Sequence, residues 1–431
     1  MTGIVSTRFT EPGLSPAASG LRQLAAFGLL ASGLCYLWFD VFGGVLRLVA
    51  PAFGLTLLIY LPSALALVSL GLWLLSTFGR PMTRRAGIAL LMILLVVLGG
   101  GLISALLGRS LPQILMALYI WLPAFVFLAL VEIGLKERLL RSFPAIFLIA
   151  SLGVFLNIFI EMPWSAATYT IGEFERDASR KWSSGGMDRL AGFSRGSPIA
   201  AAQILFGYCV LESRLRAFSW RALWWGFGLA MIWFTNSKSA LLAMVLLPPT
   251  LMLVGRLRHS QRLRRAWAAG ALVLAWMGVV YIGPLLSVLF GNSYFGVVMG
   301  ETVRSSFIDR VVNTWPLAIS AMELESHPIH WLTGRGFGGI GVAQTMFEGR
   351  GNPGDNLAVY LFVSFGLMSL FFAWAIFRGA MAAIFARESG RRDFALIVSM
   401  LGVASMANTV EGIFTLMMLA LALSCGRGRG V

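Results

Sequence analysis

Residues 86–107 read AGIALLMILLVVLGGGLISALL and carry no charged side chain. A helix of roughly 20 apolar residues is long enough to cross the hydrocarbon core of a bilayer. Residues 217–234 and 267–290 form similarly apolar runs. These runs are continuous and do not alternate apolar with polar residues, so they predict membrane-spanning helices and exclude a transmembrane β-barrel.

The composition of the whole chain also indicates a polytopic membrane protein. Apolar residues make up 58% of the 431 residues and charged residues only 12%, whereas about 25% of a soluble domain is charged. We therefore expect an all-α bundle of about twelve spans, near residues 21–39, 52–77, 86–107, 113–135, 142–160, 198–212, 217–235, 239–255, 266–290, 355–377, 394–409 and 411–425. They form one transmembrane domain, 21–425, with external loops 161–197 and 291–354 and with cytoplasmic tails 1–20 and 426–431.

The distribution of basic residues predicts the orientation of this bundle. Cytoplasmic loops retain Lys and Arg, and basic residues concentrate in the segments 79–85, 136–141, 212–216, 256–265, 378–393 and the C-terminal tail. We therefore expect both termini in the cytoplasm and the two long loops outside. The net charge of +15 is then mainly an orientation signal. A soluble basic face with interleaved aromatic residues, which nucleic-acid binding requires, is absent.

The sequence offers no pattern for a metal or a disulfide. Cys35, Cys209 and Cys425 fall within expected spans and have neither pairing nor metal-ligand spacing. No DxD or HExxH motif occurs, so we expect no protein-held metal and no cofactor.

The loop 291–354 is too long for a simple turn, and long loops in compact proteins are often functional. Apolar residues recur in it at helical spacing, at Val303, Phe307, Val311, Trp315 and Ile319. We therefore expect an amphipathic helix along the membrane surface or over a cavity. Pro316 should start or kink its second half.

Cationic residues in both external loops are candidates for binding phosphate. Arg189 and Arg195 lead into an expected span, and guanidinium groups match phosphate oxygens in bidentate geometry; snorkelling beside lipid headgroups is the alternative. Lys238, in the turn TNSKS, could neutralise a diphosphate or anchor a helix end. Arg310, and less strongly Arg304, could do the same, or lie on a solvated helix face.

The segment 334–339, GRGFGG, contains Arg335. It is no dinucleotide fingerprint, because no βαβ unit surrounds it. Its glycines instead let the backbone approach a ligand or another helix closely. His327, before Pro328, is either a general base or part of a turn.

Asp355 and Asn356 open the span after this loop. Asp is a good helix N-cap, and capping alone would explain Asp355. A carboxylate facing several cations could also accept a proton from a sugar hydroxyl, as a general base does. Both interpretations remain open.

Taken in order, these segments resemble the O-antigen polymerase and ligase superfamily of integral membrane glycosyltransferases. The similar stretches are Arg189..Gly192....Pro198, then 234–242 (FTNSKSALL), 305–315 (SSFIDRVVNTW), 327–338 (HPIHWLTGRGFG) and 355–367 (DNLAVYLFVSFGL). They keep the order of the family's motifs from residue 189 to about residue 370.

The resemblance implies a helical fold of the GT-C type in the bacterial inner membrane. It implies transfer of a glycan from undecaprenyl diphosphate to a sugar hydroxyl on the periplasmic side, without metal or nucleotide. Lys238 and Arg310 would neutralise the diphosphate, and Asp355 would stand where the ligases have a catalytic histidine. Arg189, Arg195, Arg304, Arg335, Asn356 and His327 would then bind substrate.

The aspartate at position 355 favours a polymerase over a ligase that transfers finished glycan to lipid A core. The partners of such a polymerase would be lipid-linked glycans and membrane lipids, with a chain-length regulator or an export complex as candidate protein partners. A flippase would instead need charged residues within its spans, whereas here they gather near one surface.

Overall fold

The structure, a computed structural model, describes residues 16–77, 84–171, 174–181, 183–184, 187–257, 261–290, 306–349, 354–386, 389–406 and 409–425. Arg304 and the tail 426–431 lie outside the described residues. The first helix, α1, spans Pro16–Val41.

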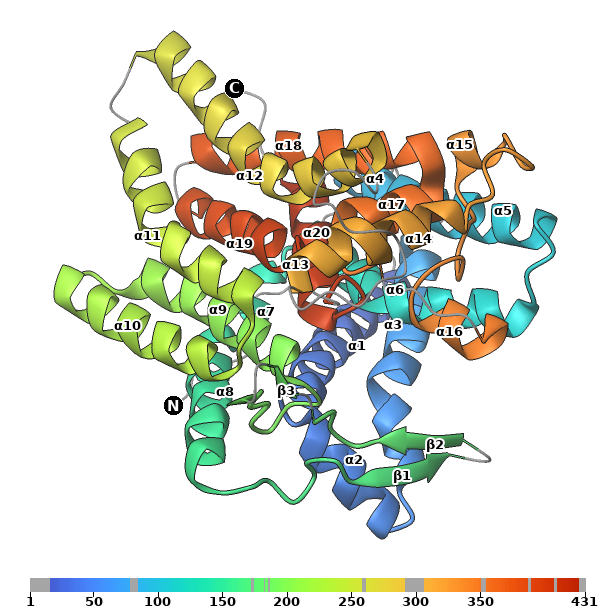
Figure 1. The fold of residues 1–431 in the computed structure, drawn as a ribbon, viewed down its shortest axis with the longest axis horizontal. Coiled ribbons are helices and arrows are strands. Elements are labelled where there is room, and N and C mark those ends of the chain that lie inside the picture. Colours follow the sequence, from blue (N-terminus) through green and yellow to red (C-terminus); the bar gives the residue numbers. More distant parts are fainter. Residues whose placement is uncertain are drawn as a thin grey trace.

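Helices occur at every apolar run identified in the sequence (Figure 1). The first half contains α2 (Gly43–Ala52), η1 (Thr56–Tyr60), α3 (Leu61–Thr77), α4 (Arg84–Leu94), η2 (Leu95–Gly100), α5 (Gly101–Leu106), α6 (Leu111–Glu132), α7 (Lys136–Leu140) and α8 (Phe143–Phe159). After the first long loop come α9 (Ser197–Arg214), α10 (Phe218–Phe234), α11 (Lys238–Leu257) and α12 (Arg262–Phe290). The last part contains α13 (Ser306–Asp309), η4 (Arg310–Thr314), α14 (Trp315–Ser320), α15 (His330–Thr333), α16 (Val342–Glu348), α17 (Leu357–Phe365), η5 (Gly366–Met368), α18 (Ser369–Phe385), α19 (Gly390–Val403) and α20 (Ile413–Ser424).

Within the described residues, eight helical segments are long and apolar enough to cross a membrane. They are Gly20–Val41, Thr56–Thr77, Ala89–Leu106, Leu111–Glu132, Lys136–Phe159, Lys238–Leu257, Leu263–Ser287 and Leu357–Phe385. The expected count of twelve also included α9, α10, α19 and α20, which are helical but do not meet this criterion. Helices α19 and α20 have 14 and 12 residues, and at about 1.5 Å per residue they are shorter than a hydrocarbon core of roughly 30 Å.

The short helices α19 and α20 lie at the protein-enclosed centre of the bundle (Figure 1). Every residue of 394–403 and of 414–423 is buried. Helix α20 packs against α6, α18 and α19, and α19 packs against α9 and α11. Their apolar character therefore comes from packing inside the protein.

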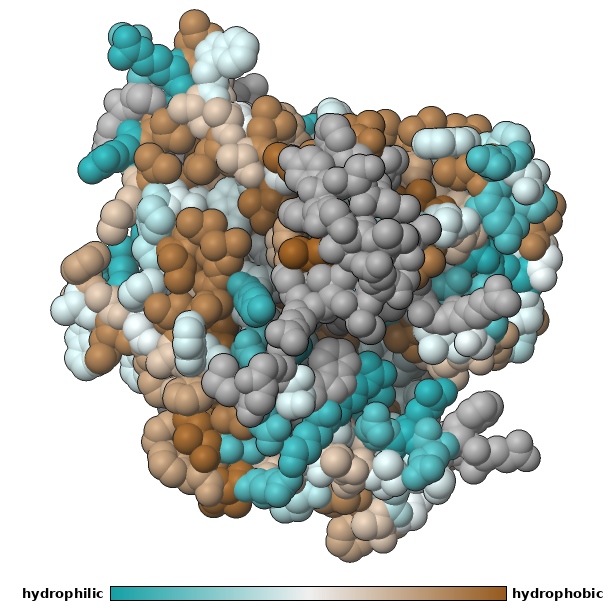
Figure 2. All heavy atoms as spheres, in the orientation of Figure 1, coloured by the Kyte–Doolittle hydropathy of each residue, from teal (hydrophilic) through white to brown (hydrophobic). Residues whose placement is uncertain are grey.

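Large apolar side chains cover much of the outer surface, as expected for contact with lipid. Leu67 on α3 and Trp267 on α12 are 61% and 76% exposed. Figure 2 shows apolar side chains over much of one face, with hydrophilic side chains gathered in its lower part. A soluble protein rarely exposes apolar surface this extensively.

The first long loop contains two short hairpins that the sequence did not predict. Strand β1 (Thr168–Ile171) pairs antiparallel with β2 (Phe174–Asp177), and β3 (Ser183–Ser184) with β4 (Met187–Asp188). The β1–β2 hairpin lies beside α2 (Figure 1).

Ion pairs tie together three segments that we expected on the cytoplasmic side. Lys136 Nζ lies 2.8 Å from Asp393 Oδ2, Arg392 Nη1 lies 2.6 Å from Glu137 Oε2, and Arg391 Nη2 lies 2.7 Å from Glu212 Oε1. We call this group the paired cluster; it consists of Lys136, Glu137, Glu212, Arg391, Arg392 and Asp393. It joins α7, α9 and α19, which is consistent with these segments sharing one side of a membrane.

Candidate active site

Two candidate residues from the second long loop and its boundary meet directly. Arg310 Nη2 lies 3.1 Å from Asp355 Oδ2, and the two side chains are only 19% and 16% exposed. Arg310 begins η4, a π-helical segment before Pro316. Proline lacks an amide donor, so the regular i→i−4 ladder is interrupted there. The predicted helix is confirmed over 306–320, with the expected irregularity at Pro316; Val303 lies outside the described residues.

The residue that caps α17 is Asn356, so of the two interpretations left open for Asp355, the helix cap is wrong. Asn356 Oδ1 accepts hydrogen bonds from the amides of Ala358 and Val359, at 2.7 and 3.1 Å. Its amide group donates to the carbonyl oxygens of Val280 and Ser405, both at 2.8 Å. The side chain is fully buried. Asn356 therefore holds the start of α17 in place and offers no atom to a substrate.

Asp355 is left to interact with Arg310. Its backbone has a φ of 38°, in the left-handed region that few residues other than glycine and asparagine adopt. Burial raises the pKa of Asp355 above its ordinary value, and the Arg310 guanidinium offsets part of that rise. Asp355 therefore forms an ion pair with Arg310 and does not cap α17.

Arg189 joins this pair from the first long loop. The amide of Leu190 donates to the carbonyl oxygen of Phe234 at 3.2 Å, which places Arg189 beside the turn between α10 and α11. Burial lowers the pKa of Arg189, and the positive charge of Arg310 lowers it further. Lys238 lies in the same turn as the first residue of α11, but its side chain is exposed.

The Arg335 side chain makes contacts within the protein that support the fold. Its guanidinium donates to the carbonyl oxygen of Gly339 at 2.8 Å and lies 3.2 Å from Glu348 Oε2. Glu348 is also paired with Arg109 and accepts a hydrogen bond from Gln113. These contacts hold the glycine-rich segment against α5 and α6.

The glycines of this segment are required by close approach to helices, one of the two expected possibilities. Gly334 has a φ of +68°, and a Cβ there would lie 2.5 Å from the amide nitrogen of Phe365. A Cβ at Gly336 would lie 2.3 Å from Ser104 Oγ. His327 is exposed at the surface, with Nε2 3.6 Å from Glu323 Oε2.

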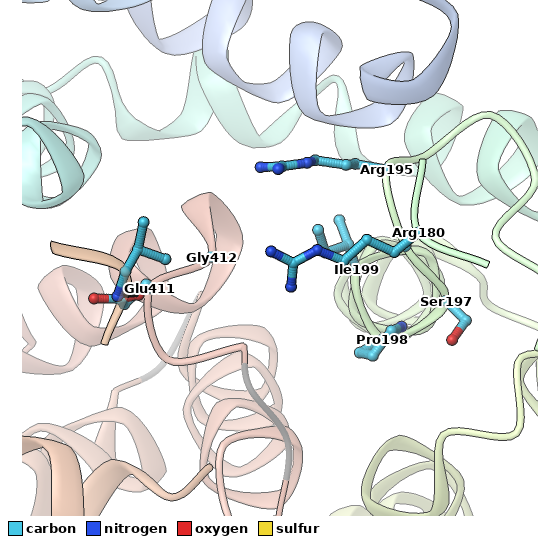
Figure 3. Close-up of a pocket in the computed structure, with 9 residues that line it drawn as sticks. Arg180, Arg195, Ser197, Pro198, Ile199, Glu411 and Gly412 are labelled. Carbon is cyan, nitrogen blue, oxygen red and sulfur yellow. Dashed lines mark hydrogen bonds between the residues drawn. The ribbon is translucent and has the colours of Figure 1, made fainter. Parts of the chain in front are cut away.

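A cavity of about 160 Å³ opens beside the start of α9 (Figure 3). Its lining consists of Arg180, Arg195, Gly196, Ser197, Pro198, Ile199, Val342, Glu411 and Gly412. In Figure 3 the Arg180 and Arg195 side chains reach across the opening toward the side on which Glu411 lies. Only Arg195 among these was a candidate from the sequence.

Backbone contacts hold the two arginines side by side. The amide of Arg180 donates to the carbonyl oxygen of Arg195 at 2.9 Å, and Ser179 Oγ donates to the same carbonyl at 3.1 Å. The chain then enters α9 at Ser197. The N-terminus of a helix carries partial positive charge and unsatisfied amide donors, which adds to the positive potential of the cavity.

The cavity arginines lack carboxylate partners within the part of the chain that the structure describes. Neither Arg180 nor Arg195 forms an ion pair there. Burial, together with the neighbouring charges of Arg47 and Arg180, lowers the pKa of Arg195 to about 10. Asp40 and Asp177 act electrostatically on Arg195 without forming an ion pair with it. Grouping cations with so little direct compensation is unfavourable, and an anionic ligand would lower that cost.

Glu411 lies in the loop between α19 and α20. Its Oε2 accepts a hydrogen bond from the amide of Val342 at 3.0 Å. Burial raises the pKa of Glu411 to about 7, while that amide and the Tyr360 hydroxyl lower it. A Cβ at Gly341, whose φ is +82°, would lie 2.2 Å from Glu411 Oε1. Glycine at this position thus leaves the space that the carboxylate occupies.

Comparison with protein-family models, curated proteins and solved structures finds no match. We therefore derive the function from the residues themselves. Arg189, Arg310 and Asp355 come together as candidates, Lys238 lies beside Arg189 through the backbone, and Arg195 lines the cavity.

Sequence reasoning missed Arg180 and Glu411. Glu411 had a usable signal, because it is an acidic residue in an otherwise apolar stretch, and ionisable residues in such stretches mark functional sites by default. Arg180 had none, since it is one of several charged residues in the loop 161–197. In the described residues, no group of three His, Cys, Asp or Glu side chains is arranged to hold a metal ion.

Proposed function

We propose that this protein is a metal-independent membrane glycosyltransferase that lengthens a polysaccharide. In this reaction the growing glycan moves from undecaprenyl diphosphate to a hydroxyl of a lipid-linked repeat unit, on the periplasmic side of a bacterial inner membrane. The product is an exopolysaccharide, a capsule or an O-antigen. The resemblance of five ordered segments to the O-antigen polymerase and ligase superfamily supports the proposal.

The observation that carries this proposal is the ion pair of Arg310 with Asp355, with Arg189 close enough to feel the charge of Arg310. They come from the two long loops and from the start of α17, and each lies in a segment that carries the resemblance. Arg310 lies within 3.1 Å of Asp355 and close enough to Arg189 for its charge to lower the pKa of that arginine. A site made of segments far apart in the chain is typical of a functional centre.

The chemistry of such a transfer fits cationic side chains. Negative charge develops on the diphosphate as the bond to the anomeric carbon breaks, and fixed positive groups stabilise that charge. Guanidinium groups contact two phosphate oxygens at once. In our proposal Arg189, Arg195 and Arg310 bind the diphosphate, and Asp355 keeps Arg310 oriented.

A purified, reconstituted protein given only lipid-linked repeat units tests the activity. A polymerase lengthens the glycan without any lipid A acceptor. An O-antigen ligase, the alternative function, transfers glycan only when lipid A core is added. A protein that moves lipid-linked units across vesicles without making either product would be a flippase.

Arg310→Ala tests the site in the same assay. Elongation should fall by about 10²–10³-fold, the usual effect of removing one group that stabilises developing charge, while lipid-linked repeats accumulate. Arg216→Ala is the matched control, because Arg216 is an exposed arginine between α9 and α10. Normal chain lengths in the Arg310 variant, with normal insertion, would exclude this site.

A further inference from the structure

Two acidic side chains compete for the role of proton acceptor in the proposed transfer. Asp355 has one carboxylate oxygen in an ion pair with Arg310; that guanidinium lowers the pKa of Asp355, although burial raises it by more. Glu411 forms no ion pair within the described residues, and its known contacts there are the Val342 amide and the Tyr360 hydroxyl. Asp355 Oδ1, in contrast, is buried without a hydrogen-bond partner in the described residues, so bonding alone does not decide between the two acids.

Position also favours Glu411. It lines the cavity that Arg180 and Arg195 line, whereas Asp355 is not among the lining residues. Figure 3 shows the two arginines extending across the opening from one wall and Glu411 on the other. Cations that could hold a leaving phosphate and an acid that could take a proton thus share one cavity.

The size of the cavity limits what it holds. Sites that enclose a whole small ligand have roughly 300–1,000 Å³, whereas this cavity has about 160 Å³. It has room for a phosphate and the reacting end of a sugar, while the rest of the glycan and the prenyl chain remain outside.

Resting on the proposed function, we infer that Glu411 is the catalytic base and that Arg180 joins Arg195 in holding the diphosphate of the lipid-linked donor. The Glu411 carboxylate takes the proton of the acceptor hydroxyl. The hydroxyl oxygen forms a bond to the anomeric carbon, the bond from that carbon to the phosphate oxygen breaks, and its electron pair leaves with the polyprenyl diphosphate. Glu411 then releases its proton to water.

The surroundings of Glu411 suit this role. A general base works best when its pKa lies near the working pH, and burial raises the pKa of Glu411 to about 7. The Val342 amide fixes one oxygen at 3.0 Å, and Gly341 closes against the other side of the carboxylate. The base is held in one orientation and is partly deprotonated at neutral pH.

Glu411→Gln in the elongation assay is the decisive experiment. Elongation should fall by about 10²–10⁴-fold, the usual contribution of a general base, while binding of the lipid-linked unit, measured separately on vesicles, persists because both arginines remain. Glu411→Asp, which retracts the carboxylate by one methylene, should keep partial activity. Glu161→Gln is the matched control, because Glu161 is an exposed acid of the same loop as Arg180.

The pH profile separates Glu411 from Asp355. The wild-type rate should rise as the pH passes through about 7 and then level off, and this rise should be absent in the Glu411→Gln variant. Asp355→Asn should lower the rate but keep the rise. Elongation by a folded Glu411→Gln variant at a rate within tenfold of wild type overturns the inference alone; failure of the wild-type protein to elongate overturns the proposed function with it.

Discussion

The two ends of α9 stand in contrasting electrostatic surroundings. Its first residue, Ser197, lines the cavity of Arg180 and Arg195, where those arginines have no carboxylate partner in the described chain. Glu212, near its other end, belongs to the paired cluster, in which Arg391 Nη2 lies 2.7 Å from its carboxylate. At about 1.5 Å per residue, roughly 22 Å of helix separates Ser197 from Glu212.

The comparison separates charged side chains that stabilise the fold, in the paired cluster, from charged side chains at the cavity that could bind a ligand. In the paired cluster each cation forms an ion pair with an acid from another helix, so these charges are compensated within the protein. At the cavity the grouped arginines form no ion pair within the described residues, and the charges of Asp40 and Asp177 offset part of the repulsion at Arg195. Substitutions at the two ends should therefore have opposite signatures, one in stability and the other in activity.

Among substitutions at the two ends of α9, Arg195→Ala should give the largest effect, and it should appear in activity. We expect elongation to fall by about 10²–10³-fold, with an unchanged or higher unfolding temperature, because a partly buried cation without a partner is removed. Unfolding in detergent and elongation in vesicles measure the two quantities. A lower unfolding temperature with full activity would show that Arg195 serves the fold, as the paired cluster does at the other end of α9.

Glu212→Gln should show the reverse signature. Removing one partner of a buried ion pair costs roughly 3–5 kcal/mol; we expect the lower end, because Arg391 is 33% exposed and water screens part of its charge. Denaturant unfolding measures the loss. The double variant with Arg391→Gln should recover part of it, and a single variant as stable as wild type would show that the pair contributes little.

Gly341→Ala should lower both the stability of the fold and the rate of elongation. The backbone at Gly341 has φ 82° and ψ −150°, a conformation confined almost entirely to glycine, and forcing another residue into it costs about 1–3 kcal/mol. The added Cβ would also displace Glu411, so elongation should fall. Gly349→Ala is the matched control, since Gly349 has φ +66° with open space around its Cβ position; it should lose some stability and keep its activity.

The apolar helices follow from local composition, and the sequence therefore predicts them well. Runs such as 86–107 contain no charged side chain and a single polar one, Ser104, so a helix is their only stable form in lipid. The same composition cannot distinguish a span from a short helix enclosed by protein. Helix α20 is as apolar as a span, yet it is buried against other helices.

The site depends on tertiary partners that the sequence does not display. Asp355 and Asn356 are equally good N-caps by type. The choice falls on Asn356 because its amide group donates to the carbonyls of Val280 and Ser405, which a carboxylate cannot do. Glu411 entered no prediction because the sequence analysis counted it as the first residue of the span expected over 411–425.

The difference in stability between wild type and the Glu411→Gln variant should change with pH, because only wild type carries an acid at this position. The pKa of Glu411 is raised by burial from 4.5 to about 7, so the protonated form favours the folded state. The corresponding stability is complete below pH 4.5 and is lost as the pH rises through about 7. Relative to the glutamine variant, wild type should therefore melt at progressively lower temperature between pH 5 and pH 8, roughly the interval in which such a group titrates. A constant difference across this range would contradict the burial of an ionisable Glu411.

Lys238→Ala should give the smallest effect, although the sequence placed Lys238 among the catalytic candidates. Its side chain is exposed at the first residue of α11, so water weakens its interaction with a diphosphate far more than that of the enclosed Arg310. We expect a loss of less than about tenfold, shrinking further at 1 M salt, where the screening length falls to about 3 Å. A loss as large as that of Arg310→Ala, and insensitive to salt, would instead place the Lys238 ammonium in direct contact with the phosphate.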